Sequence, residues 1–218
     1  MSIRPATRKD IPSILHILTT AFWDEDAVGR FMHPHRDKYP NDVSKYWRGV
    51  VRESWWRGNH HWQIVIVDGE GVVVGFAGWV FVDGNPPTLY QTLLSLSLHT
   101  YTFLSTLLSP NRASSPKNLT APSRALPFYT HKLPPPPRYD LETLAVHPAH
   151  QGRGYGGLLV QWGVDRAVGE GVPAAVVTAE GTEAFYGRWF GRRAGRVTEG
   201  VGNPLAGVRG GVVMVRDV

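Results

Sequence analysis

The sequence predicts an α/β (α+β) fold with about seven strands flanked by helices, in a single domain over residues 1–218. Three observations lead to this prediction. Strand-like and helix-like segments alternate along most of the chain. Hydrophobic residues make up 42% of the chain and charged residues 19%, which suits a folded core and not a disordered chain. Residues 83–138 break the alternation and indicate a long insertion between the third and fourth strands.

The first part of the chain predicts the order strand, helix, helix, strand, strand. Ile3–Ala6 is strand-like, and Thr7 followed by Asp10 resembles a capping box before an amphipathic helix. After a loop, Asp42 is placed to cap a second helix. The next two strands, Trp62–Val67 and Val72–Val82, are joined by Asp68-Gly69-Glu70-Gly71, a strong hairpin signal.

The insertion and the second half follow. Thr88–Leu108 favours a helix that packs on the core, whereas Ser109–Leu133 is rich in Ser, Pro and Asn and is expected to wrap the surface. Pro134–Pro137 predicts an extended spacer. Regular structure then resumes with alternating strands and helices, and the chain ends in an expected hairpin: strand Tyr139–Val146, helix Tyr155–Val168, strand Ala174–Ala179, helix Thr182–Phe190, and strands near Ala194–Glu199 and Gly210–Val215.

Charge and cysteine content exclude several classes of function. The net charge of +5 favours anionic partners such as phosphate-bearing cofactors. The basic residues are scattered, and their densest group, Arg188, Arg192, Arg193 and Arg196, is too short to act as a nucleic-acid-binding tail. We therefore expect no nucleic-acid partner. The chain has no cysteine, so it has no disulfide, no thiolate nucleophile and no Cys-ligated zinc.

The uncharged stretch between Asp83 and Arg112 could be mistaken for a membrane span. Nine of the 20 positions of Leu89–Leu108 are Gln, Ser, Thr or His, which is too polar for a lipid-facing helix. The opening residues, MSIRPATRKDIPSILHIL, show no apolar segment with a small-residue cleavage site, so no signal peptide is expected. These patterns predict a soluble, cytoplasmic protein with no membrane partner.

The segment Leu141–Leu159, LETLAVHPAHQGRGYGGLL, carries the most specific chemical signal. A buried-looking strand leads into a glycine-rich turn and then into an amphipathic helix. Glycines at positions 152, 154, 156 and 157 leave backbone N–H groups free to face an anion, and the helix N-terminus adds a partial positive charge. Arg153 can add a charge-assisted contact. The pattern predicts a pyrophosphate site.

Two common phosphate-binding motifs fit this segment poorly. The chain lacks the Lys-Ser/Thr pair of a Walker loop. Gly152, Gly154 and Gly157 have the G-x-G-x-x-G spacing of a dinucleotide-binding fold, but no acidic residue ends a second parallel strand about 20 residues later. The strands before the motif also form a hairpin, which is unlike that fold.

Gln151-Gly152-Arg153-Gly154-Tyr155-Gly156 matches the pattern [RQ]-x-x-G-x-[GA], and Leu144-Ala145-Val146 precedes it on a strand. This resembles the acetyl-CoA signature of the GNAT superfamily of N-acetyltransferases. The resemblance implies the GNAT fold, with a mixed, mostly antiparallel sheet, and acetyl-CoA as cosubstrate. It covers the chain outside the insertion. The loop Phe22–Pro40 is similar to that of fungal members that act on small molecules.

The resemblance also implies which residues hold acetyl-CoA. In the family, the fourth and fifth strands splay apart, and unpaired backbone groups on the fourth hold the pantetheine arm; here these belong to Leu144, Ala145 and Val146. The pyrophosphate is implied to bind the backbone of the turn, at Gln151, Gly152, Arg153, Gly154, Tyr155 and Gly156.

Proton transfer requires a base for the amine and an acid for the CoA thiolate. Asp140 and Glu142 are two residues apart on one strand, so both project from one face, and they occupy the family's positions for a catalytic base. Burial would raise either pKa into a useful range. The alternative for each is an ion pair with a nearby arginine. Tyr186 lies at the family's position for the acid, and its alternative is ordinary core packing.

The acceptor is expected to be a primary amine of a small molecule, attacked directly in a ternary complex. Trp23, Phe31 and His33 lie in the loop that borders the acceptor site in this fold, and we expect them to bind substrate. A silent acyl-CoA-binding module and an acetyltransferase of protein N-termini or lysines are the alternatives. The pairs His33/His35, His60/His61 and His147/His150 lack metal-ligand spacing, so no metal is expected.

Overall fold

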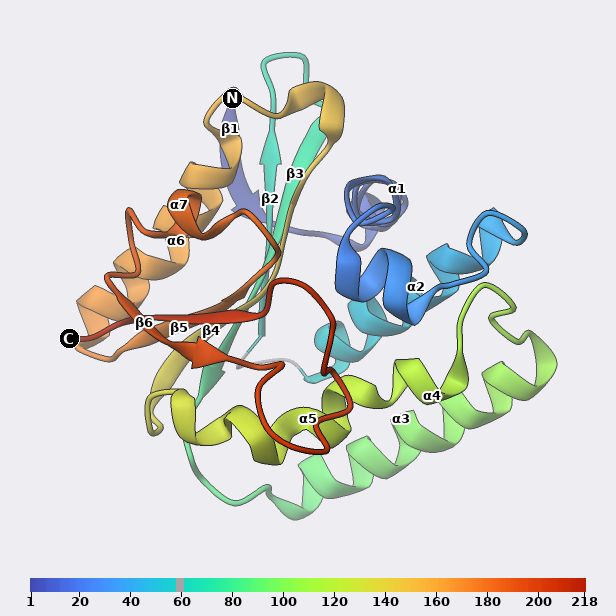
Figure 1. Ribbon diagram of the computed structural model, residues 1–218. Helices are drawn as coiled ribbons and strands as arrows, with labels where there is room; N and C mark the ends of the chain where they lie inside the picture. The colour runs from blue at the N-terminus through green and yellow to red at the C-terminus, as the bar shows by residue number, and fades with distance from the viewer. Residues whose placement is uncertain (58–60) are drawn as a thin grey trace.

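The computed structural model describes residues 1–57 and 61–218, and in these residues it contains one sheet of seven strands (Figure 1). The strands lie in the order β1-β2-β3-β4-β5-β7-β6. β4 and β5 pair in parallel, and the other neighbouring strands pair antiparallel. The predicted mixed, mostly antiparallel sheet is confirmed. The strand bounds are β1 Ser2–Pro5, β2 His61–Val67, β3 Val73–Val82, β4 Arg138–Val146, β5 Ala174–Thr178, β6 Arg192–Arg196 and β7 Val212–Arg216.

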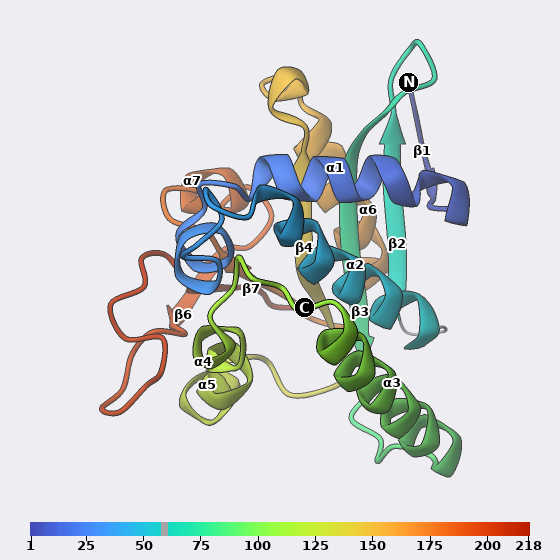
Figure 2. The same ribbon diagram turned by 90° about the vertical axis from the view of Figure 1, so that its right-hand side faces the viewer.

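Helices cover both faces of the sheet (Figure 2). α1 (Ile11–Ala21) and α2 (Pro40–Arg57) pack on one face, where Ile14, Leu18 and Trp47 meet side chains of β2, β3 and β4. α6 (Tyr155–Glu170) and α7 (Glu183–Tyr186) belong to the core on the other face. Two apolar layers therefore enclose the central strands, which explains why β2 and β3 are buried along most of their length.

One close contact fixes α6 against β3. The indole of Trp79 is fully buried, and its N–H donates to the carbonyl of Leu159 at 3.2 Å. Gly163 lies one turn further along α6, and a Cβ at this position would lie 2.1 Å from the Trp79 ring. A glycine is required here because the helix approaches the ring too closely for any side chain.

The predicted start of the first helix is confirmed in its contacts. The carboxylate of Asp10 accepts from the Thr7 N–H at 2.7 Å and from the Thr7 hydroxyl at 2.8 Å. Arg4 on β1 adds two bonds, at 2.7 and 2.8 Å. A 3₁₀ turn, Arg8–Asp10, precedes α1. These partners hold the pKa of Asp10 well below its usual range, with the Arg4 contact as the largest cause.

The predicted cap of the second helix is wrong. α2 begins at Pro40, so Asp42 lies inside its first turn. Its buried carboxylate accepts from the backbone N–H of Arg112 at 3.0 Å and from Arg112 Nε at 2.8 Å, and Lys45 lies at 2.9 Å. Arg112 is 70 residues away, so Asp42 attaches the insertion to α2 instead of capping the helix.

The two halves of the insertion exchange their predicted roles. α3 (Leu89–Leu108) forms as expected, but it has no buried residue and lies on the outside of the molecule (Figure 1). The Pro- and Ser-rich half instead folds into α4 (Pro116–Leu119), α5 (Ala121–Tyr129) and a 3₁₀ turn, Thr130–Lys132. Ala121 and Ala125 of α5 are buried against β5 and β7. Small residues allow α5 to lie close to the sheet, and the composition of this segment concealed that role.

The end of the chain differs from the prediction in its lengths. The helix expected over Thr182–Phe190 is the single turn α7, followed by turns. β6 and β7 form the predicted antiparallel hairpin. Among the described residues, no helix is both long enough and apolar enough to cross a bilayer.

Candidate active site

The parallel pair at the centre of the sheet separates after three residues. β4 pairs with β5 only from Tyr139 to Leu141, opposite Ala174 to Val176, whereas it pairs with β3 along its whole length. From Glu142 onward β4 has a strand on one side only. An extended ligand can therefore hydrogen-bond to the free edge of β4 as an added strand does.

The backbone directions along this edge differ from one residue to the next. The His147 N–H donates to the Val74 carbonyl on β3 at 2.9 Å. Because alternate residues of a strand face the same neighbour, Ala145 also directs its backbone to β3, where it pairs with Phe76. Leu144 and Val146 direct theirs to the free edge, and the Val146 carbonyl accepts from the Gln151 side chain at 3.0 Å. Leu144 thus offers an N–H and a carbonyl to a ligand.

The glycine-rich turn connects this edge to α6. Gly152 and Gly154 have φ values of +75° and +83°, a backbone conformation that side-chain-bearing residues rarely adopt. Gly154 is the N-cap of α6, and no side chain caps the helix start. The first N–H groups of a 16-residue helix are thus available to an anion, with the helix dipole behind them.

Gly156 and Gly157 have a different function from the glycines of the turn. A Cβ at Gly156 would lie 3.3 Å from the Phe185 ring, and one at Gly157 would lie 3.2 Å from the Trp189 ring. The two glycines therefore let α7 and the following turn pack against the first turn of α6. This packing brings Tyr186 to the same end of the sheet as the turn.

Glu142 lies at an irregularity in β4. Thr143 pairs with Gly78 and Leu141 with Trp79, so Glu142 is the extra residue of a β-bulge. Its side chain is exposed to solvent, although the protein around it removes part of its hydration. Loss of hydration raises the pKa of Glu142 to about 7, and the charge of Asp140 adds to this effect. A carboxylate of this pKa is a suitable general base near neutral pH.

Asp140 has a different environment. Arg138 Nε donates to both of its oxygens, at 2.9 and 3.1 Å, and the same guanidinium donates to the Pro134 carbonyl at 3.0 Å. Burial raises the pKa of Asp140, and the Arg138 contact opposes this rise. The ion pair considered as an alternative is thus formed by Asp140. The charge of Asp140 in turn raises the pKa of Glu142.

Tyr186 is buried in the larger core. Its ring contacts Phe185 edge-on at 4.9 Å and Phe190 at 6.2 Å between ring centroids. Burial raises the pKa of the Tyr186 phenol, so the hydroxyl keeps its proton through the neutral range. The side chain therefore packs in the core and remains a proton donor, so both readings of Tyr186 are compatible with its position.

Two tyrosines that the sequence did not single out lie near the carboxylates. Burial raises the pKa of Tyr129 on α5, and the charges of Asp140 and Glu142 raise it further. Burial raises the pKa of Tyr46 on α2 to about 12, and the charges of Glu25 and Glu142 contribute to the rise. Glu142 therefore lies within electrostatic range of both α2 and α5. No motif marks Tyr129, because its position depends on how the insertion folds.

The three predicted acceptor-site residues have different environments. His33 is fully buried: its Nδ1 bonds to the Val28 carbonyl at 2.7 Å and its Nε2 to the Asn111 amide at 3.2 Å. Both ring nitrogens are thus used within the protein, and burial lowers the pKa of His33. A contact of His33 with substrate stays a prediction, which this buried ring with both nitrogens bonded does not favour.

Phe31 and Trp23 are both half-buried. Phe31 packs against the cluster that contains Ala121 and Leu205. Trp23 lies 6.0 Å from the Arg36 guanidinium. Neither residue is placed beside Glu142 by a contact, so their role at the acceptor site stays a prediction.

Two further features were considered as sites. Among residues 1–57 and 61–218, no three His, Cys, Asp or Glu side chains are grouped so as to hold a metal ion; His60 lies outside the described residues.

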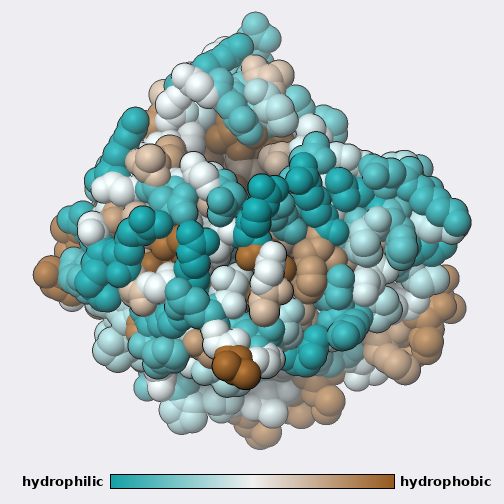
Figure 3. Space-filling view, viewed as in Figure 1, coloured by the Kyte–Doolittle hydropathy of each residue, from teal (hydrophilic) through white to brown (hydrophobic). Residues whose placement is uncertain are grey.

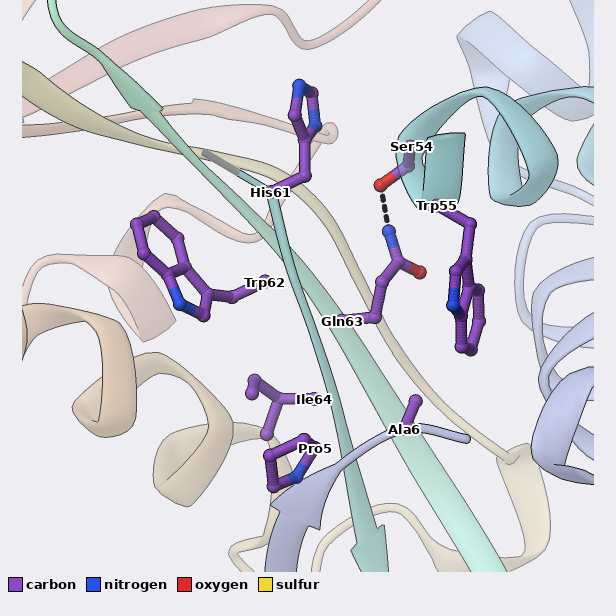
Figure 4. Close-up of a pocket in the computed structure, with 8 residues that line it drawn as sticks. All are labelled: Pro5, Ala6, Ser54, Trp55, His61, Trp62, Gln63 and Ile64. Atoms are coloured by element: carbon purple, nitrogen blue, oxygen red, sulfur yellow. Dashed lines mark hydrogen bonds between the residues drawn. The ribbon is translucent and has the colours of Figure 1, made fainter. Parts of the chain in front are cut away.

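Figure 4 shows a pocket of about 230 Å³ between β1, β2 and α2, where Gln63 donates to Ser54. Its volume is smaller than that of ordinary ligand pockets, which is about 300 Å³ or more.

Comparison with known proteins agrees with this geometry. Residues 120–191 match the model of the acetyltransferase (GNAT) family, and this segment contains β4, the turn, α6, β5 and α7. The fold resembles a crystal structure from Corynebacterium glutamicum described as histone acetyltransferase HPA2 and related acetyltransferase. That match has 20% identity and a TM-score of 0.64, and it covers 99% of this chain and 95% of the other.

Two further structures share the fold. The GCN5-related N-acetyltransferase from Kribbella flavida is 20% identical, with a TM-score of 0.51 and coverage of 100% and 97%. The PaiA N-acetyltransferase from Thermoplasma acidophilum, in complex with coenzyme A, is 10% identical, with a TM-score of 0.50 and coverage of 100% and 98%. At these identities the likeness establishes the GNAT fold. The family-model match covers residues 120–191, about a third of the chain.

Proposed function

We propose that this protein is an acetyl-CoA-dependent N-acetyltransferase that acetylates a primary amine of a small molecule. The observation that carries the proposal is the free edge of β4 beyond Leu141, which leads directly to an uncapped, glycine-rich helix start. The edge suits an extended pantetheine arm, and the turn Gln151–Gly156 suits a pyrophosphate. A family match over the same segment and a structural neighbour that contains coenzyme A agree with this ligand.

In this proposal, side chains of the site supply both proton transfers of direct acyl transfer. Acetyl-CoA supplies the thioester whose carbonyl carbon the amine nitrogen attacks. Glu142, ionised above about pH 7, takes a proton from the ammonium before attack or from the nitrogen during it. The C–S bond then breaks, the Tyr186 hydroxyl gives its proton to the leaving thiolate, and the second proton lost by the acetylated nitrogen restores the tyrosine. The products are the N-acetylated amine and CoA. The cysteine-free chain cannot form a thioester intermediate of its own.

The insertion favours a small acceptor over a protein chain. Burial raises the pKa of Tyr129 on α5, and the charges of Asp140 and Glu142 add to the rise, so the insertion lies near the two carboxylates. Hydrogen bonds hold it there: the Asn118 amide donates to the Phe31 carbonyl at 2.7 Å and the His35 N–H to the Ala113 carbonyl at 3.0 Å. The likeness of the loop Phe22–Pro40 to fungal small-molecule enzymes stays a prediction.

A panel of amines tests the proposal, with released CoA measured by a thiol reagent. The protein has no cysteine and gives no background in this assay. We expect turnover with at least one free amine and none when the same amine is the side chain of a peptide lysine. Turnover of the peptide alone would favour a protein acetyltransferase. Binding of acetyl-CoA without turnover of any acceptor would favour a silent binding module.

A further inference from the structure

The outer surface of α3 is an exposed apolar face. The helix has no buried residue, and between Asp83 and Arg112 the chain has no charged residue. Figure 3 shows hydrophobic residues gathered along the lower right edge of the molecule, where Figure 1 places α3. At least half of each of nine large side chains is exposed: Leu89, Tyr90, Leu93, Leu96, Tyr101, Phe103, Leu104, Leu107 and Leu108.

Part of this face has the spacing of a helix-packing seam. Six exposed positions follow one another at intervals of 4, 3, 4, 3 and 4 residues: Leu89, Leu93, Leu96, Thr100, Phe103 and Leu107. At about 100° per residue they fall within an arc of about 80° on the helix surface. Such a seam is typical of helices that pack lengthwise against another helix.

The opposite side of α3 faces the rest of the molecule. Leu94, Leu98 and Ser105 are only half exposed and lie on that side. Arg52 of α2 donates to Thr102 at 3.4 Å, and its guanidinium lies 4.3 Å from the centre of the Tyr101 ring. Most of the seam thus points away from the body and is accessible to a partner, whereas Leu96 also borders a hollow between α3, the end of α2 and the end of β3.

The polar side chains of α3 present little obstacle to burial. The hydroxyls of Thr92, Ser97, Thr100, Ser105 and Thr106 each donate to the carbonyl four residues earlier, at 2.7 to 3.0 Å. Burying a hydroxyl is costly mainly when it loses its hydrogen-bond partner. The polar member of the seam, Thr100, keeps its partner within the helix.

We propose that α3 pairs antiparallel with α3 of a second copy of this chain. The seam is symmetric about Leu98: reversing the helix superposes Leu89 on Leu107, Leu93 on Phe103 and Leu96 on Thr100. A twofold homodimer requires such a self-complementary patch, because residue i of one copy meets residue j of the other and the reverse. The inference does not depend on the enzymatic activity.

The area and the charge of the face agree with this occupant. At about 200 Å² for a large side chain, the nine residues expose roughly 1,200 Å², and the five apolar residues of the seam contribute roughly 640 Å² of this, a large part of the about 800 Å² per partner of a stable interface. A helix without charge brings no repulsion between copies. It also lacks the basic residues with which a surface helix binds anionic lipid, so the pattern favours a protein partner over a membrane.

Sedimentation analysis over a wide concentration series tests the proposal. We expect a dimer for the wild type and an increase in the dimer dissociation constant of at least about a hundredfold for Leu96→Glu, which places a charge in the seam twice. Val168→Glu is the matched control, because Val168 is 55% exposed on α6, away from α3; it should dimerise as the wild type does. A wild type that stays monomeric, or Leu96→Glu that dimerises normally, overturns the proposal.

Single cysteines in this cysteine-free chain test the direction of pairing. A mixture of Leu93→Cys and Phe103→Cys should form disulfide-linked dimers under mild oxidation, whereas either variant alone should not. Cross-linking of each variant alone would show parallel helices and contradict the antiparallel pair. Binding of the wild type to neutral lipid vesicles, without dimers, would identify a membrane as the occupant and refute a second copy.

Discussion

Replacing Glu142 by Gln should abolish the acidic limb of the pH–rate profile. With a pKa of about 7, the base is about 9% ionised at pH 6 and about 91% ionised at pH 8, so kcat/KM of the wild type should rise about tenfold over this range. The glutamine cannot take a proton, and the rate should fall by about a hundredfold or more at pH 8. The remaining activity should be flat between pH 6 and 8.

Asp140→Asn is the informative partner variant. The charge of Asp140 helps to raise the pKa of Glu142, so its removal should move the acidic limb to lower pH without abolishing it. The measurement is kcat/KM against pH by CoA release. Acceptors of different pKa separate the titration of the enzyme from that of the amine.

Stability gives an independent readout of the same group. Because the folded-state pKa of Glu142 lies above the ordinary value, folding opposes its ionisation, and stability falls as pH rises through the interval from about 4.5 to 7. Glu142→Gln should therefore match the wild type in urea at pH 4 and exceed it at pH 8. If Glu142→Gln kept both the acidic limb of the pH–rate profile and the rate of the wild type, Glu142 would be excluded as the base.

Three further outcomes follow from single contacts. Tyr186→Phe should lower kcat by about tenfold to a thousandfold with little change in acetyl-CoA affinity, and an unchanged kcat with chemistry rate-limiting would exclude Tyr186 as the acid. Gly163→Ala should destabilise the fold by about 2 kcal/mol or more in urea, although alanine favours helices, because its Cβ would overlap the Trp79 ring; a neutral result would contradict the packing described. Asp10→Asn should lower the free energy of unfolding by about 2 kcal/mol at pH 7. This deficit should shrink as pH falls below 4, because the low pKa of Asp10 stabilises the fold only while its carboxylate is ionised, and a deficit independent of pH would contradict the ion pair.

Local patterns in the sequence were sufficient where the structure is itself local. The contacts between Thr7 and Asp10, the β2–β3 hairpin and the turn Gln151–Gly156 each involve residues within a few positions of one another. The spacing of Asp140 and Glu142 on one strand likewise predicted a carboxylate pair. The spacing could not show that Arg138 forms an ion pair with Asp140, or that a bulge at Glu142 changes the local register.

Contacts between distant segments account for the errors. His33 was expected at the acceptor site, and the sequence could not show that Asn111, 78 residues away, bonds to its ring. Asp42 was expected to cap a helix, and Arg112 instead draws it to the insertion. The apolar α3 was expected in the core, whereas the alanines of α5 fit against the sheet more closely. Which segment packs against the sheet depends on how the shapes of the two surfaces fit, and the composition of a segment does not indicate its shape.

Titration calorimetry with acetyl-CoA, comparing the wild type with Gly154→Glu and Gly202→Glu, tests the central claim most directly. Gly154 and Gly202 both have positive φ, +83° and +78°, and open space around them, so the two variants carry the same backbone strain. At position 154 the carboxylate would face the pyrophosphate, and the resulting like-charge repulsion should weaken binding at least about a hundredfold. Gly202→Glu should bind as the wild type does. Equal affinities in all three proteins would contradict a pyrophosphate site at the start of α6.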